Sequence, residues 1–148
     1  MIESDIERNL VAYFKSLAIE GLDVTGLWQP SVFSRGEERI SPATLVVAVP
    51  SFNYDTFTVC DVSTDISFTV VARVDLCDGD ILKYIDKIAS SLEKWNLTTD
   101  CDTLEVFNTD EFTAAGVNVQ GGAMPDLDQI KKIWTVQFKL TLRGSILH

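Results

Sequence analysis

Apolar side chains recur at intervals of three or four residues at the start of the chain. The members of this stripe are Ile2, Ile6, Leu10, Phe14 and Leu17. Such spacing places them on one side of a helix, so the pattern predicts an amphipathic helix over residues 2–20 that ends at Gly21. Ser4 and Glu7 have the spacing of a capping box, in which each side chain binds a backbone N–H at the helix start.

A second stripe of the same kind lies further along the chain. Its members are Ile81, Leu82, Ile85, Ile88, Ala89, Leu92 and Trp95. Their spacing predicts a second amphipathic helix. The residues just before it, Asp78, Gly79 and Asp80, supply a turn and an N-cap.

Apolar and polar residues alternate along two longer segments, residues 66–76 and residues 130–143. Alternation turns one face of a strand toward a core and the other toward solvent, which is typical of an antiparallel sheet. The run at 45–49 has no polar member, which favours a strand buried on both faces or flanked by covering elements. Shorter strands are predicted at residues 22–24, 45–49, 56–61, 104–107 and 112–119, the last with a bulge at Gly116.

The predicted elements follow the order helix, loop, three strands, helix, three strands. Two helices with apolar stripes and a sheet with one apolar face bury one another when both helices pack on that face. We therefore predict an α+β fold, with a mainly antiparallel sheet and two amphipathic helices packed on one face. The length of 148 residues, 46% of them hydrophobic, favours a single domain over residues 1–148. A long loop is expected at about 28–44, and loops of that length are more often functional than incidental.

The opposite face of the sheet is predicted to be polar. It would carry Val71, Arg73, Gln137, Lys139 and Arg143. If Arg73 and Arg143 are neighbours, they form a positive cluster on an acidic protein, which would suit an acidic partner surface. The alternative is an ordinary solvated strand face.

Charge and composition narrow the classes of partner. Twelve basic residues against 22 acidic ones leave a net charge of −10, which repels phosphates, so we expect no sequence-specific nucleic acid partner. The longest purely apolar stretch, Leu45–Val49, is far shorter than the ~20 residues of a membrane-spanning helix, and the acidic N-terminus does not resemble a secretory signal. We therefore expect no membrane partner. Cys60, Cys77 and Cys101 match no metal or disulfide spacing, which favours reduced thiols in a cytosolic protein.

Residues that usually carry catalysis are sparse. The sole histidine is His148, at a chain end that is expected to fray, and no glycine-rich phosphate motif is present. We expect no enzyme activity, no cofactor and no metal. Asp75, Asp78 and Asp80 could bind a divalent cation, although acids at a helix start explain them as well. The alternatives are a metal-dependent hydrolase built on these acids and a small-ligand or adaptor module with a pocket between the second helix and the sheet.

Three segments carry a family resemblance. They are the opening Ile2–Ile6, the strand and helix from Ile66 to Trp95 with the run Ser67–Arg73, and the closing Trp134–Phe138. The chain contains no short diagnostic motif. In the order of its predicted helices and strands and in their hydrophobic pattern, it resembles the tail terminator and tail-completion proteins of long-tailed bacteriophages. The resemblance implies an N-terminal amphipathic helix, an irregular long loop, an antiparallel sheet and a later helix on the same sheet face.

The resemblance also implies a structural role. Proteins of this family form a ring, usually a hexamer, that caps the finished tail tube and gives the head or neck its docking surface. The partners would be further copies of the chain, the tail tube, and neck or head-completion proteins, in the virion tail after assembly in the bacterial cytoplasm. Protruding loops at 28–42 and 120–128 are natural donors of subunit contacts. The candidate subunit or partner contacts are Trp28, Phe33, Arg35, Arg39, Arg73, Gln120, Met124, Lys139 and Arg143.

Overall fold

The computed structural model describes residues 2–28, 43–54, 61–74, 81–98, 100, 102–120 and 124–146. Its helices are α1 (Ile2–Ser16), α3 (Ile81–Trp95) and the short 3₁₀ helix η2 (Glu105–Phe107). Its strands are β1 (Leu22–Gly26), β2 (Ala43–Ala48), β3 (Asn53–Tyr54), β4 (Asp61–Arg73), β5 (Phe112–Gln120), β6 (Asp126–Asp128) and β7 (Ile133–Ile146). Neither α-helix in these ranges is long and apolar enough to cross a membrane.

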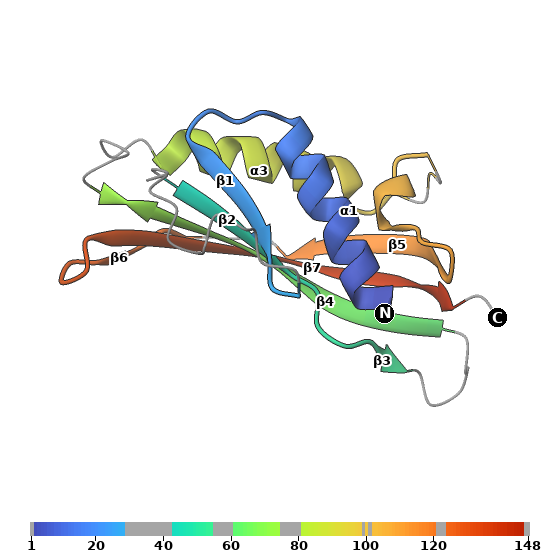
Figure 1. Cartoon of the computed structure of the whole chain (residues 1–148). Helices are drawn as coiled ribbons and strands as arrows, with labels where there is room; N and C mark the ends of the chain where they lie inside the picture. Colours follow the sequence, from blue (N-terminus) through green and yellow to red (C-terminus); the bar gives the residue numbers. More distant parts are fainter. Residues whose placement is uncertain are drawn as a thin grey trace.

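The described strands form one mostly antiparallel sheet with the order β1-β2-β4-β7-β5, while β3 pairs with β4 and β6 with β7. Only the pair of β1 and β2 is parallel among the described strands. Figure 1 shows α1 and α3 on the same side of this sheet. The predicted α+β fold, with both helices on one face, is confirmed.

Alternation along β4 and β7 builds the sheet side of the core. Phe68 of β4 pairs with Phe138 of β7, and both are buried on the helix-facing side. The next pair, Thr69 and Gln137, faces the other way, and Gln137 is exposed. The face assignment predicted for these two strands is therefore confirmed.

Aromatic rings join the helices to the sheet. Phe14 of α1 contacts Phe68 of β4, with ring centroids 5.6 Å apart. Trp95, the last residue of α3, lies 6.1 Å from Phe14 and 4.9 Å from Phe107 of η2, measured between ring centroids. Edge-on pairs of this kind stabilise by about 0.5–1.5 kcal/mol each beyond their burial. The rings therefore hold α1, α3 and η2 in fixed positions over the sheet.

A glycine on β7 makes room for a further aromatic stack. The Phe112 ring is fully buried and stacks on Phe52, with ring centroids 5.1 Å apart. A Cβ atom at Gly144 would collide with the Phe112 ring and with the carbonyl oxygen of Thr113. Only a residue without a side chain allows this close approach.

The first helix differs from the prediction at both ends. α1 ends at Ser16 rather than residue 20, because Ala18 has a left-handed φ of 50° that turns the chain back toward β1. The predicted capping box is wrong. Ser4 lies inside α1, which begins at Ile2, and the carboxylate of the buried Glu7 binds the backbone at Leu27 and Trp28.

Two short apolar runs also differ from the prediction. Residues 104–107 form a turn and the 3₁₀ helix η2 rather than a strand, because the carboxylate of Asp100 accepts the N–H of Asp102 and organises a local turn. β2 alternates between buried and half-buried residues, so it is not buried on both faces.

The bulge predicted at Gly116 is confirmed by a register shift between β5 and β7 at that residue.

The remaining strand predictions need smaller changes. The strand predicted at 22–24 is β1, and the strand predicted at 66–76 is β4, which begins earlier, at Asp61. Residues 56–60 of the predicted strand at 56–61 lie outside the described residues.

Candidate functional site

The predicted contact residues fall into two groups. Phe33, Arg35 and Arg39 lie outside the described residues, together with the rest of the segment 29–42. The others, which are all exposed, are Trp28, Arg73, Gln120, Met124, Lys139 and Arg143. A residue must be exposed to contact a partner. The positions of these side chains decide which of them can take part in the same contact.

The structure brings two of these residues together and separates two others. Gln120 of β5 pairs directly with Lys139 of β7. Arg143 pairs with Ser63 of β4. Ser63 lies ten residues before Arg73 on β4, which is roughly 33 Å at the usual rise of a strand. Arg73 and Arg143 are therefore not neighbours, because they share a sheet face but not a register position, and of the two alternatives for this face the positive cluster is excluded.

The sheet face opposite the helices carries both signs of charge. Thr141 donates a hydrogen bond of 2.7 Å to Asp65 Oδ1 across β7 and β4. Lys139 and Arg143 flank Thr141 on the same strand and face the same way. The acidic Asp65 therefore lies between two cations, and the face is an ordinary solvated strand surface.

Side chains cap the free edge of the sheet at β5. Asn96 Oδ1 accepts the N–H of Val119 at 2.9 Å, and Asn108 Oδ1 accepts a second β5 N–H at 2.8 Å. The N–H of Leu97 donates to the carbonyl of Val117 at 2.8 Å. An edge whose polar groups are already bonded is a poor template for strand addition. Contacts with other molecules at this edge would have to use side chains.

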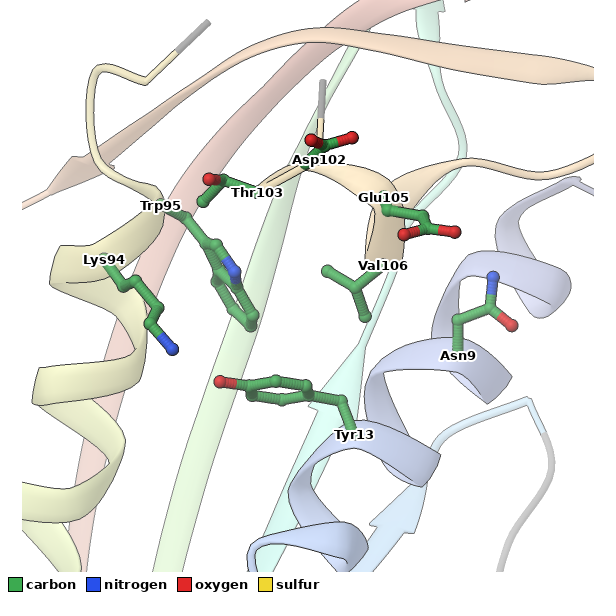
Figure 2. Close-up of a pocket in the computed structure, with 8 residues that line it drawn as sticks. All are labelled: Asn9, Tyr13, Lys94, Trp95, Asp102, Thr103, Glu105 and Val106. Carbon is green, nitrogen blue, oxygen red and sulfur yellow. The ribbon is translucent and has the colours of Figure 1, made fainter. Parts of the chain in front are cut away.

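A hollow of about 630 Å³ opens between α1, the end of α3 and η2 (Figure 2). Its floor contains the half-buried side chains of Tyr13 and Val106. Trp95 also lines the hollow, and its ring centroid lies 5.1 Å from that of Tyr13. The polar residues around the floor, which form the rim of the hollow, are Asn9, Lys94, Asp102, Thr103 and Glu105.

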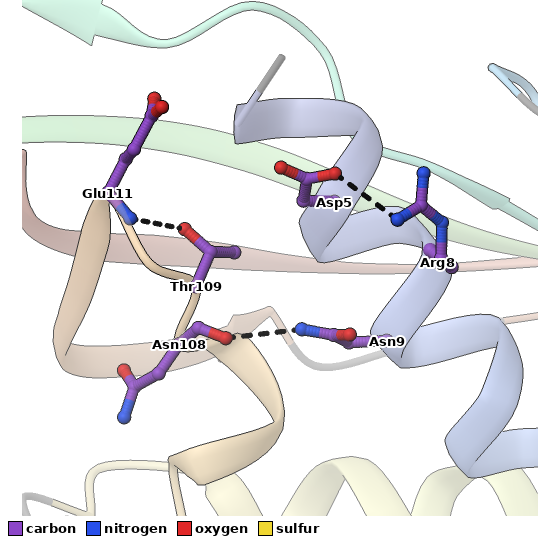
Figure 3. A network of polar contacts seen from close by, with 6 residues as sticks. All are labelled: Asp5, Arg8, Asn9, Asn108, Thr109 and Glu111. Atoms are coloured by element: carbon purple, nitrogen blue, oxygen red, sulfur yellow. Dashed lines mark hydrogen bonds and ion pairs between the residues drawn. The ribbon is translucent and has the colours of Figure 1, made fainter.

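Hydrogen bonds hold the rim in place. Asn9 reaches from α1 and donates a hydrogen bond of 3.1 Å to the carbonyl of Asn108 (Figure 3). The carboxylate of Asp100 accepts the N–H of Asp102 at 3.1 Å and the hydroxyl of Thr103 at 3.2 Å. The side of the hollow formed by η2 is therefore tied both to itself and to α1.

The rim carries more negative than positive charge. Asp102 and Glu105 are exposed on the η2 side, and Lys94 lies on the α3 side (Figure 2). No lysine or arginine occurs between Trp95 and Ile130 in the sequence. The η2 side of the hollow is therefore acidic, whereas the α3 side has one cation.

A hairpin tip, residues 129–132, joins β6 to β7. Asp128 Oδ1 accepts the N–H groups of Ile130 and Lys131 at 3.0 and 3.1 Å, which is an Asx-type turn. The strand predicted from residue 130 onward therefore begins later, at Ile133, because the aspartate closes a turn in front of it.

The hairpin tip is exposed and held at its base. The N–H of Val74, just after β4, donates a hydrogen bond of 3.0 Å to the carbonyl of Lys132. Ile130 is 95% exposed, and Lys131 and Lys132 are exposed beside it. The tip therefore presents one apolar side chain and two cations at the end of the sheet.

A buried carboxylate fixes the chain at the end of β1. Glu7 accepts the N–H of Leu27 at 2.9 Å and the N–H of Trp28 at 2.7 Å. A Cβ atom at Gly26 would lie only 2.5 Å from Glu7 Oε2, so the glycine permits this approach. The indole N–H of Trp28 donates to the carbonyl of Val49 at 2.7 Å. Trp28 is thus a structural residue as well as an exposed one.

Metal binding finds no support in the described part of the chain. Among those residues, no group of three histidine, cysteine, aspartate or glutamate side chains could hold an ion. Asp75, Asp78 and Asp80 lie outside the described residues, so a cation site on them stays a prediction.

Sequence patterns did not predict the hollow or the tip. The hollow combines residues from three separate segments, and no local motif relates them. The signal for the tip was Asp128, since an aspartate before a short polar segment favours a turn. The alternation of the following strand concealed it, because Ile130 continues the apolar positions of β7.

No protein-family model matches the chain, and no curated protein matches it either. A function for the chain therefore has to be inferred from its own residues. The relevant features are the layered fold, the exposed contact residues, the hollow and the hairpin tip.

Proposed function

We propose that the chain is a phage structural protein, a tail terminator or tail-completion subunit that forms a ring, caps the tail tube and mediates head-tail joining. The observation that carries the proposal is the packing of α1 and α3 on one face of a mostly antiparallel sheet (Figure 1). The family resemblance implies the same arrangement. Because both helices cover one face, the other face and the projecting segments stay open to other molecules.

The described surface suits contacts between rigid subunits. A closed ring needs a subunit whose two sides carry different, complementary contacts. Met124 is 85% exposed and Ile130 is 95% exposed, so each can bury apolar surface in a contact with another subunit. The capped edge at β5 favours contacts through such side chains over strand addition.

The proposed partners follow from this role. They are further copies of the chain in a ring, with six copies as the family norm, the tail tube, and neck or head-completion proteins. The net charge of −10 per subunit suits a ring around passing DNA, because like-charged walls do not adhere to phosphates. The role involves no catalysis, cofactor, metal, membrane or sequence-specific nucleic acid contact, and it belongs to the virion tail after assembly in the bacterial cytoplasm.

A small-ligand binding module is the second candidate, and the hollow is the observation that favours it. Its volume of about 630 Å³ falls within the range of ligand sites. Trp95 lines the hollow but is only 2% exposed, so its ring face is not presented to a ligand. A thermal-shift screen of metabolites distinguishes the two, because a ligand that binds the folded state raises the melting temperature.

The proposed function is tested by assembly and by tube binding. Size-exclusion chromatography with light scattering measures the mass of the purified chain, and co-sedimentation measures its binding to tail tubes purified without their terminal ring. We expect the chain to bind the tubes, whether it forms a ring-sized oligomer in solution or assembles only on the tube end. A folded chain that fails to sediment with the tubes contradicts the proposal.

A further inference from the structure

The hairpin tip has an apolar residue, Ile130, followed by two lysines, and the carboxylate of Asp128 closes the turn before them. Ile130 projects from the turn with 95% of its surface exposed, and in the described part of the chain neither Lys131 nor Lys132 makes an ion pair. Burial of an isoleucine side chain favours association, because it removes apolar surface from water. Among the described residues, the tip therefore has no ionic partner for its lysines and no apolar partner that covers Ile130.

The hollow has the complementary chemistry. Tyr13 and Val106 provide an apolar floor, and Asp102 and Glu105 provide two carboxylates on one side of the rim (Figure 2). Neither carboxylate makes an ion pair among the described residues. An apolar floor beside negative charge matches an apolar side chain beside positive charge.

The tip cannot reach the hollow of its own molecule. β7 begins beside the tip at Ile133 and ends at Ile146, and its length is roughly 43 Å at the usual strand rise. Ile146 pairs with Phe112, the residue that begins β5 shortly after η2. The tip and η2 thus lie at opposite ends of the sheet (Figure 1), and a sheet of this size does not fold back on itself.

We propose that the hairpin tip of one copy docks into the hollow of the next copy. In this contact Ile130 covers Tyr13 and Val106, while Lys131 and Lys132 lie beside the acidic side of the rim. The two surfaces differ and occupy opposite ends of the subunit, so the contact is head-to-tail, and repetition closes a ring when the rotation per subunit permits. The inference rests on the proposed function, because it names the contact through which the ring forms.

Charge also selects the orientation of the tip in the hollow. Lys94 occupies the α3 side of the rim, opposite Asp102 and Glu105. If the tip entered the other way round, its lysines would face Lys94, and like charges brought together oppose association. The acidic side of the rim attracts the lysines, and the α3 side repels them.

Charge reversal on each surface tests the contact directly. One variant carries Lys131→Glu and Lys132→Glu, the second carries Asp102→Lys and Glu105→Lys, and a third combines all four changes. Sedimentation velocity at protein concentrations up to about 1 mM measures the dissociation constant between subunits. We expect each single-surface variant to raise this constant about tenfold or more. We expect the combined variant, and an equimolar mixture of the first two, to associate again.

Two further variants separate a lost contact from a lost fold. Ile130→Asp should weaken association about tenfold or more, and it cannot remove core packing, because the side chain that it replaces is 95% exposed. The matched control carries Lys15→Glu and Lys87→Glu, which change the net charge as much as the tip variant does, on exposed helical positions. Circular dichroism confirms that each variant is folded. The control should assemble like the unaltered chain.

The outcomes separate this inference from the proposed function. If neither charge-reversed surface changes the dissociation constant between subunits, the docking is contradicted and the hollow is assigned to another partner. The same conclusion follows if the combined variant stays dissociated. A monomer at about 1 mM also contradicts the docking. None of these results contradicts the proposed function if the chain still binds the tail tube. If the chain assembles through the tip but does not bind the tube, the proposed function alone is contradicted.

Discussion

Removal of the Glu7 carboxylate should destabilise the fold strongly. Its two oxygens accept the N–H groups of Leu27 and Trp28 at 2.9 and 2.7 Å, and the residue is only 1% exposed. Glu7→Ala deletes both acceptors and leaves a void between α1 and the end of β1. Glu7→Gln keeps the volume and one acceptor oxygen.

The magnitude follows from the two hydrogen bonds. A bond to a charged acceptor contributes about 1.5–3 kcal/mol. The N–H of Leu27 retains a second acceptor, the carbonyl of Val47 at 3.1 Å, so the main loss is at Trp28. We expect Glu7→Ala to lower the free energy of unfolding by about 2–4 kcal/mol. Glu7→Gln should lower it by about 1–2 kcal/mol.

Urea unfolding followed by far-ultraviolet circular dichroism measures both variants. The matched control is Glu93→Ala, which removes an exposed glutamate from α3 and should change the free energy of unfolding by about 0.5 kcal/mol or less. In thermal scans, Glu7→Ala should melt roughly 5–15 °C below the unaltered chain. If Glu7→Ala and Glu93→Ala unfold at the same urea midpoint, the carboxylate is not an anchor and the reasoning fails.

Three further predictions concern the sheet and the acidic segment before α3. Gly144→Ala should cost about 1–3 kcal/mol by overpacking against Phe112, and a calorimetric scan that shows no loss would contradict the assigned contact. The double change Asn96→Ala and Asn108→Ala should uncap the β5 edge and increase light scattering on storage, whereas scattering equal to that of the unaltered chain would show that the caps do not protect it. Calorimetric titration with Mg²⁺ or Mn²⁺ should give no heat at millimolar metal. A binding isotherm that disappears when the aspartates of residues 75–80 are replaced would support the metal alternative.

Periodicity predicted the faces of the long strands but not their register. The alternation in β4 and β7 correctly assigned Arg73 and Arg143 to the face away from the helices. Their separation depends on which residues pair across the two strands, and that pairing is set by turns and by contacts distant in sequence. The face assignment therefore succeeded, whereas the choice between a positive cluster and a solvated face depended on the register and stayed open until the structure gave it.

Short local patterns were less informative, because tertiary partners decided them. Ser4 and Glu7 match a capping box in spacing, yet the Glu7 carboxylate binds backbone groups 20 residues away. The run at 104–107 has the composition of a strand, but buried Leu104 and Phe107 lie three residues apart, a spacing that suits a 3₁₀ turn. Short apolar runs cannot distinguish these cases without knowledge of their neighbours.

The candidate site was predictable only in part. The loop predicted at 120–128 follows from its turn-forming residues, and Met124 and Gln120 are both exposed. The predicted loop is too long at both ends, because Gln120 is the last residue of β5 and Asp126–Asp128 form β6. The hollow requires α1, α3 and η2 to meet, which depends on packing between Tyr13, Trp95 and Phe107. Side-chain packing between distant segments is not visible in the order of residues.

Electron microscopy of tail tubes tests the central claim most directly. Tubes assembled without their terminal ring are mixed with the purified chain, and the tube ends are imaged and averaged. We expect a closed ring of identical subunits at one end of each tube, with each subunit contacting the next head-to-tail. Bare tube ends beside an excess of folded protein would contradict the account.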